Sequence, residues 1–336
     1  EEKQMEQIRL FERRKGETSA KAVVRNISNY SLYILLILMI TLVSMVSQDF
    51  FTVDNFVNLF RQISISGVAA IGMTFIMLID EIDLSAGANA ALAGVIACML
   101  LKEEIGILAS YGYAGILAAI IIAIGISALC GALCGIFHTY LKIPSFIVTL
   151  GVSYIYKGAA LLLTNAYPVI GMTEKFEVIG RGYIGKIPVP IIIMFVLYFI
   201  AWFVLKYTKF GRSAYAIGGN TEAAQLSGIP VKRNKVLFFA IGGLTAGLAG
   251  VILASRMFSG QPTACANTGL EAIAAVTIGG TSAKAGRGRM WGTLLGSLIM
   301  GMISNALNIM KISPYYQFVA LGAVLVIAVA IDKLKD

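Results

Sequence analysis

Charge is scarce in this chain. Only 13% of its 336 residues are charged, whereas a soluble domain carries about 25%. The mean hydropathy is +0.82, and 58% of the residues are apolar. Long apolar runs, such as "SLYILLILMITLVSMV" at 31–46 and "IIIMFVLYFIAWFVL" at 191–205, approach the ~20 residues that a helix needs to cross a bilayer. The composition excludes a soluble globular domain and predicts an all-α, polytopic membrane protein.

Histidine and cysteine are also rare. One histidine and four cysteines provide no disulfide framework and little support for a metal or nucleophile relay. Cys130, Cys134 and His138 share one face of an expected helix, but three ligands on one straight helix cannot surround an ion. Gly131 and Gly135 on the same helix have the spacing of closely packed helices. We interpret this face as a packing surface and expect no metal site.

Phosphate-binding loops are missing from the sequence. The segment "GTSAKAGRG" places a lysine among glycines without forming GxxxxGK[ST], and there is no GxGxxG. We therefore expect the chain to be no enzyme by itself and to hold no cofactor. Any transport through it would draw its energy from an ion gradient or from a partner protein.

The apolar segments divide the chain. The first 28 residues are polar and charged, without the early apolar core of a cleavable signal peptide. We predict a cytoplasmic tail at 1–28 and a transmembrane domain at 29–336, with about ten helices, some short or broken, in two loosely similar halves. The predicted crossings are 30–48, 59–79, 86–101, 113–138, 144–163, 188–206, 236–256, 269–280, 291–310 and 315–332.

Basic residues gather in particular loops. Seven Lys and Arg residues lie in the N-terminal tail, six in 206–235, three in 281–290 and two after 332. The positive-inside rule places these segments, and both termini, in the cytoplasm. The net charge of +9 is thus explained by orientation in a membrane, and we expect no nucleic-acid partner.

A short polar helix is expected within the cytoplasmic loop 207–235, at "GGNTEAAQLSGI" (218–229). Asn220 is a good N-cap, Glu222 suits the positive first turn, and Gly228 is a natural stop. About eight residues fall short of the ~12–15 that an isolated helix needs in water. Either the parent protein packs this helix or a partner receives it. It could receive force from an external ATPase, and the alternative is an ordinary surface loop.

Two segments depart from the regular pattern. Residues 269–280 are too short, because twelve residues rise ~18 Å against a hydrocarbon core of ~30 Å. Upstream, "AIGMTFIMLIDEIDLSAG" at 70–87 ends an apolar helix in three carboxylates. The two regions, 70–94 and 272–296, echo each other, and paired broken segments in two halves are typical of a translocation pathway.

Several motifs resemble one known family. They are "AIGMTFIML", "IDLSAG", "GRSAYAIGGNTEAAQLSGI", "LEAIAAVTIGGTS", "GRGRMWGTLLGSLIMG" and "YYQFVALGAVLVIAVAIDKL". Together they resemble the permease subunits of bacterial ATP-binding-cassette (ABC) importers for monosaccharides, most closely the ribose type, over about residues 28–335. The alternatives are a permease of related architecture for nucleosides or branched-chain amino acids, and an ion-coupled secondary carrier.

The resemblance implies a multi-pass protein of the bacterial inner membrane that imports a ribose-like pentose or a hexose by alternating access. Two permease copies would work with a cytoplasmic ATPase, which holds ATP and Mg, and with an extracytoplasmic sugar-binding protein. The sequence does not name the sugar. By resemblance, the residues that couple to the ATPase are Gly218, Gly219, Asn220, Glu222, Ala223, Ala224 and Gly228.

The chain departs from the family at two places. Asp80 and Glu81 stand where the family usually has glycines, and Ala285–Gly286 replaces a glycine pair. The carboxylates of Asp80 and Glu81 could form a proton or sodium site. Alternatively, these residues lie at the cytoplasmic surface and cap the next helix.

The predicted pathway lies along 80–89 and 267–282, which we expect to face each other. A neutral sugar needs hydrogen-bonding groups rather than a fixed counter-charge. Glu271 could instead stabilise the start of its helix, and the whole arrangement could serve close helix packing. The candidate pathway residues are Asp83, Ser85, Asn89, Asn267, Glu271, Thr281 and Ser282.

Overall fold

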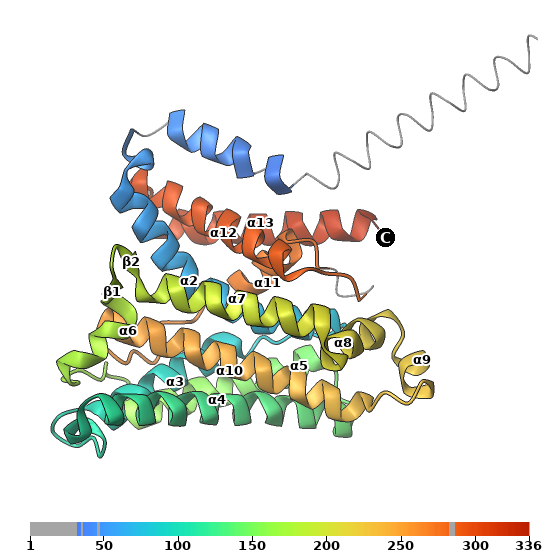
Figure 1. Cartoon of the computed structure of the whole chain (residues 1–336), viewed down its shortest axis with the longest axis horizontal. Coiled ribbons are helices and arrows are strands. Elements are labelled where there is room, and N and C mark those ends of the chain that lie inside the picture. The colour runs from blue at the N-terminus through green and yellow to red at the C-terminus, as the bar shows by residue number, and fades with distance from the viewer. Residues whose placement is uncertain (1–31, 35, 46–47, 282–285, 336) are drawn as a thin grey trace, which may run out of the picture.

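The computed structural model describes residues 32–34, 36–45, 48–281 and 286–335 (Figure 1). Within these ranges the regular structure is helical apart from two isolated bridges and one hairpin, formed by β1 (Tyr183–Ile184) and β2 (Ile187–Pro188). The hairpin and α9 (Thr221–Leu226) lie at opposite ends of the long axis in Figure 1. We call these ends the hairpin end and the α9 end.

Twelve α-helices account for most of the described residues. In chain order they are α2 (Val53–Leu78), α3 (Ala86–Leu101), α4 (Gly112–Leu141), α5 (Ser145–Thr164), α6 (Glu177–Arg181), α7 (Val189–Tyr207), α8 (Lys209–Gly219), α9, α10 (Val231–Met257), α11 (Thr268–Ile278), α12 (Met290–Ile309) and α13 (Pro314–Lys335). Three short 3₁₀ turns precede α2, α4 and α6.

Six of the helices in the described part of the chain are long and apolar enough to cross a membrane. They are Val53–Leu78, Ala109–Leu141, Ser145–Thr164, Val189–Tyr207, Val231–Met257 and Met290–Ile309. The other four predicted crossings coincide with the shorter apolar helices Leu32–Met45, Ala86–Leu101, Thr268–Ile278 and Tyr315–Val324. The all-α membrane architecture is confirmed, as is the short helix at 269–280, while the number of ten crossings stays a prediction.

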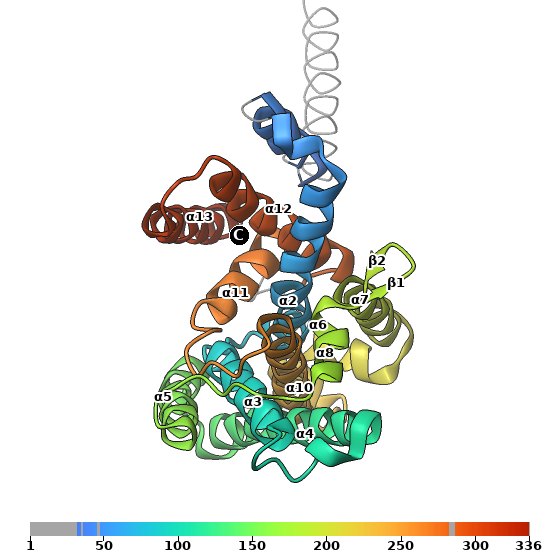
Figure 2. The same ribbon diagram turned by 90° about the vertical axis from the view of Figure 1, so that its left-hand side faces the viewer.

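Helix α10 lies at the centre and packs against α2, α3 and α4 (Figure 2). Its glycines let the helix backbones approach closely. A methyl group at Gly250 would lie 1.8 Å from the carbonyl oxygen of Ala90 on α3. One at Gly131 on α4 would lie 2.2 Å from the carbonyl oxygen of Phe239 on α10. The predicted packing face of α4 is therefore confirmed.

The two echoing segments also contact each other. Helices α11 and α12 pack against α2, and the hydroxyls of Thr74 and Thr293 share a buried hydrogen bond of 2.8 Å. Outward faces of α5 and α7 carry exposed apolar side chains, including Tyr154, Leu162 and Phe199. Such faces suit contact with lipid, whereas the polar contacts are kept inside the helix assembly.

Candidate functional site

Helix α9 is held at its start by the predicted cap. The side-chain oxygen of Asn220 accepts a hydrogen bond from the backbone N–H of Ala223 at 2.9 Å, and Glu222 lies in the first turn. The chain leaves the helix at Gly228, whose φ of +81° suits glycine best. Gly218 and Gly219 lie before this cap and end the preceding helix α8, because Asn220 breaks the helical path with extended backbone. Their coupling role stays a prediction.

Most of α9 faces away from the rest of the chain. Ala224 is its one buried residue, while Glu222, Ala223 and Gln225 are exposed. Leu226 is 90% exposed, although burying a leucine stabilises a protein by about 1.5–3 kcal/mol. Leu226 is not among the coupling residues predicted from the sequence. The sequence feature that could have identified it is an apolar side chain within a short polar helix.

Gly218 lies where three segments meet at the α9 end. A methyl group at this position would lie 1.8 Å from the carbonyl oxygen of Leu78, at the end of α2. It would also lie 2.8 Å from the Cα of Gly286, in the loop between α11 and α12. The segment that leads into α9 therefore contacts the ends of both broken segments.

A buried ion cluster, formed by Glu81, His138 and Lys235, lies near this junction. The Oε1 atom of Glu81 lies 2.8 Å from Nε2 of His138 and pairs with the ammonium of Lys235. These contacts join the loop after α2 to the end of α4 and the start of α10. Glu81 therefore caps no helix in the described structure, and the capping interpretation is wrong for this residue.

The charge of Glu81 follows from its surroundings. Burial by itself raises the pKa of a carboxyl group, but hydrogen bonds from His138 and Lys235 favour the ionised form. Their combined effect holds the pKa of Glu81 below its ordinary value. Glu81 is thus ionised at neutral pH, and Lys235 supplies its counter-charge.

Three predicted pathway residues, Asp83, Ser85 and Asn89, are buried and hydrogen-bonded. The Oδ1 atom of Asp83 accepts hydrogen bonds from the backbone N–H and the hydroxyl of Ser85, at 2.7 and 2.6 Å. The amide of Asn89 exchanges hydrogen bonds with the carbonyl oxygen and hydroxyl of Ser127 on α4, at 3.0 and 2.8 Å. The contact of Asn89 joins α3 to α4, whereas that of Asp83 with Ser85 is local to the start of α3. A pathway role for the three stays a prediction.

The residues of the second predicted pathway segment, 267–282, have different surroundings. Thr281 is fully buried, and a methyl group at Gly288 would lie 2.5 Å from its hydroxyl oxygen. Ser282 lies outside the described residues. Asn267 and Glu271 line a cavity of about 410 Å³. The two predicted segments do meet, because a methyl group at Gly87 would lie 3.4 Å from the backbone nitrogen of Gly269.

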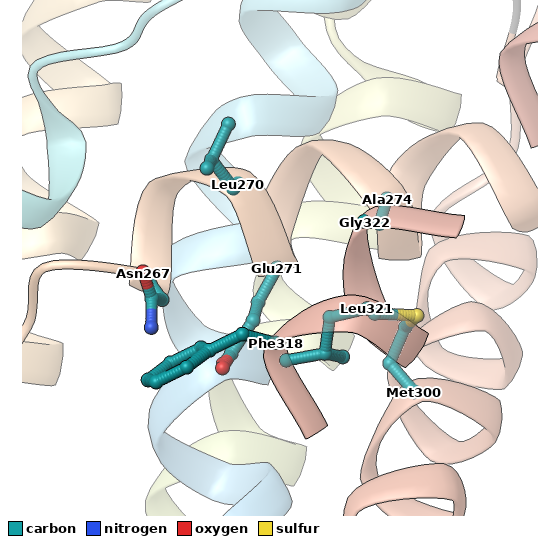
Figure 3. Close-up of a pocket in the computed structure, with 8 residues that line it drawn as sticks. All are labelled: Asn267, Leu270, Glu271, Ala274, Met300, Phe318, Leu321 and Gly322. Carbon is teal, nitrogen blue, oxygen red and sulfur yellow. The ribbon is translucent and has the colours of Figure 1, made fainter. Parts of the chain in front are cut away.

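Figure 3 shows the residues that line this cavity. Asn267 and Glu271 lie one turn apart, and the ring of Phe318 from α13 lies beside the carboxylate of Glu271. The remaining wall is mostly apolar. A carboxylate and an amide next to an aromatic ring provide both hydrogen bonding and apolar contact, as small-molecule sites do.

Comparison with known proteins identifies the family. The family described as "Branched-chain amino acid transport system / permease component" matches residues 55–329. The chain belongs to this family. The ribose import permease of Haemophilus influenzae is 43% identical over 289 residues, covering 85% of this chain and 87% of the relative. The ribose import permease of Bacillus subtilis is 42% identical, covering 84% and 85%.

More distant relatives have names for other sugars. The xylose transport system permease of Haemophilus influenzae is 31% identical over 345 residues, covering 84% of this chain and 90% of the relative. No solved structure matches the chain. The predicted resemblance to ribose-type ABC permeases is confirmed, and the relatives and the apolar helices together indicate a multi-pass inner-membrane transport subunit.

Proposed function

We propose that this chain forms the membrane pathway of an ABC importer for a monosaccharide, a ribose-like pentose or a hexose. Relatives named for ribose and xylose support the class of cargo. The observation that carries the proposal is the connection of α9 to the rest of the molecule. A small exposed helix is joined through Gly218 to the ends of both broken segments.

In this proposal a separate ATPase, which binds ATP and Mg, receives α9 in a groove. Leu226 and Glu222 are exposed for that contact, and Asn220 keeps the helix formed. Movement of the ATPase would then displace the end of α8. Since a methyl group does not fit between Gly218 and Leu78, the displacement reaches α2 directly and changes access to the pathway.

The other partners follow from the two ends of the molecule. We place the α9 end, with both termini, in the cytoplasm, and the hairpin end outside, where a sugar-binding protein would deliver its cargo. A second copy of the chain would cover the exposed face of α13 that carries Phe318 and Val319. A carboxylate such as Glu271 costs several kcal/mol next to lipid, and a second copy would keep lipid away from it.

Reconstitution tests this function. The chain, its ATPase and its binding protein are placed in vesicles, and ATP-dependent uptake of D-ribose, D-allose and D-xylose is measured. We expect uptake of at least one sugar only when all three proteins and ATP are present. Uptake driven by an ion gradient without the ATPase would identify a secondary carrier. Import of leucine or a nucleoside, with no sugar uptake, would support a permease for that other cargo.

A further inference from the structure

A second cavity, of about 430 Å³, lies toward the hairpin end. It meets the cavity of Figure 3 at Glu271, Met300 and Leu321, which line both. We call it the hairpin-end cavity. Its polar lining comes from α2, α10, α11 and α12, and consists of Gln62, Ser66, Arg256, Thr268, Glu271 and Ser304.

Arg256 and Glu271 have opposite charges on the walls of this cavity. Among the described residues, neither side chain has an ion-pair or hydrogen-bond partner, and they form no ion pair with each other. Elsewhere, Glu81 pairs with Lys235 and Glu177 pairs with Arg181. Unpaired charges among transmembrane helices are costly and usually mark a functional site. A ligand that contacts both groups would compensate them.

The position of Arg256 is fixed by its neighbours. It belongs to the last turn of α10, and its carbonyl oxygen accepts a hydrogen bond from Nε of Arg181 at 2.7 Å. The charge of Arg61 on α2 acts on it as well. The guanidinium of Arg256 and the carboxylate of Glu271 thus bring opposite charges to the lining of one cavity.

We propose that Glu271 and Arg256 form a sugar-recognition subsite in the hairpin-end cavity. A sugar hydroxyl can donate a hydrogen bond to the carboxylate while a neighbouring hydroxyl accepts one from the guanidinium. Gln62, Ser66 and Ser304 can donate or accept further hydrogen bonds. The volume suits a small ligand, since such sites occupy about 300–1,000 Å³. The inference rests on the proposed function, because it takes the cargo to be a monosaccharide.

An amino acid could also bridge the two charges, with its carboxylate on Arg256 and its ammonium on Glu271. The lining of the cavity is mixed, because Ile65, Leu253, Ala264, Met300 and Leu321 also contribute to it. The uncharged polar groups Gln62, Ser66 and Ser304 favour a sugar, since a leucine side chain would leave them without hydrogen-bond partners, which costs free energy. A sugar satisfies these groups, and relatives are named for ribose, allose and xylose.

The main test uses the reconstituted importer with D-ribose. We expect Glu271→Gln and Arg256→Gln to lower the initial uptake rate at subsaturating D-ribose by at least tenfold, because each removes a charge-assisted hydrogen bond. ATP hydrolysis stimulated by the binding protein should persist in both. Glu104→Gln and Lys102→Gln are the matched controls, since these residues pair with each other, and their uptake should stay within twofold of the unsubstituted protein.

If those variants fail to assemble, a labelling experiment tests the sugar subsite instead. Ser304 lines the cavity. A small thiol reagent should label the Ser304→Cys variant at least threefold more slowly when D-ribose saturates the importer. The parent chain, with its four native cysteines, gives the background. Protection supports the subsite, and unchanged labelling in an importer that transports D-ribose overturns it.

Different results would contradict the sugar subsite and the proposed function. If the unsubstituted importer takes up D-ribose and both Gln variants transport it normally, the subsite is wrong and the function stands. If the importer takes up leucine and no sugar, the proposed function is wrong. Loss of leucine uptake in Glu271→Gln and Arg256→Gln would then assign the cavity to a zwitterion and also overturn the sugar subsite.

Discussion

Gly218 lies directly against the carbonyl oxygen of Leu78, and a methyl group between them would be 1.8 Å from that oxygen. Among the described residues, no heavy atom lies within 4 Å of the corresponding position at Gly219. Two adjacent glycines at the end of α8 thus have opposite surroundings. One is required by a backbone contact, and the other tolerates a side chain.

This difference predicts opposite outcomes for two alanine variants. Gly218→Ala should cost about 1–3 kcal/mol by overpacking and lower ATP-dependent uptake at least tenfold. Gly219→Ala should be neutral or slightly stabilising, because alanine is favoured over glycine within a helix. Thermal unfolding in detergent and uptake in vesicles measure the two effects. Equal behaviour of the two variants would contradict the contact described here.

Leu226 is expected to be the main apolar contact with the ATPase. Leu226→Ser should weaken binding of the ATPase at least tenfold, since burying a leucine contributes about 1.5–3 kcal/mol. Ser227→Ala, at the neighbouring exposed position, is the control and should bind normally. Titration of the purified permease with the ATPase gives both affinities, and unchanged binding of Leu226→Ser would remove this residue from the interface.

Proline substitution tests whether α9 must be helical. The backbone N–H of Ala224 donates to the carbonyl oxygen of Asn220 at 2.9 Å, so Ala224→Pro removes this bond and costs ~3 kcal/mol. Thr221→Pro is the matched control, because proline is favoured at the first position of a helix. We expect Ala224→Pro and Glu222→Lys to insert in the membrane without supporting uptake. Normal transport in both variants would contradict the proposal that α9 couples the permease to the ATPase.

The ion cluster predicts a pH-dependent contribution to stability. Glu81→Gln leaves Lys235 buried without its counter-charge and should lower the free energy of unfolding by about 3–5 kcal/mol at pH 7. Because the pKa of Glu81 is lowered in the folded protein, this difference is fully present above about pH 4.3, the ordinary glutamate value. It should shrink as the pH falls through the lowered pKa. Glu177→Gln, at an exposed pair, should cost at most about 1 kcal/mol.

Orientation in the membrane is testable by labelling from each side. We expect Asn220→Cys to react with an impermeant thiol reagent from the cytoplasm and Lys175→Cys to react from outside. The two positions lie at the α9 end and in the segment before α6. Reaction of both from the same side would contradict the ten-crossing topology.

Local features were predictable from the sequence. The cap at Asn220, the stop at Gly228 and the short helix α11 depend on residues close to each other in the chain, and all three are confirmed. The packing face of α4 was predictable as well, because small residues four apart indicate a close helix neighbour without naming it.

Contacts between distant residues were not predictable from these patterns. Glu81 lies 154 positions from Lys235, and one sequence contains no signal that pairs them. The same holds for Arg256 and Glu271, whose shared cavity depends on how five helices pack. The pathway prediction named Glu271 because it begins a short helix, and missed Arg256 because it ends a long one.

The backbone contacts of α10 determine which positions of this protein can accept substitutions. A methyl group at Gly243 would lie 2.2 Å from the carbonyl oxygen of Ser127, and one at Gly250 would lie 1.8 Å from that of Ala90. A random library at these two positions should therefore return almost only glycine. Cavity-lining positions such as Gln62 and Ser304 border open space, so we expect other side chains to fit there. New cargo specificity can then arise by substitution in the cavity while the central helix keeps its sequence.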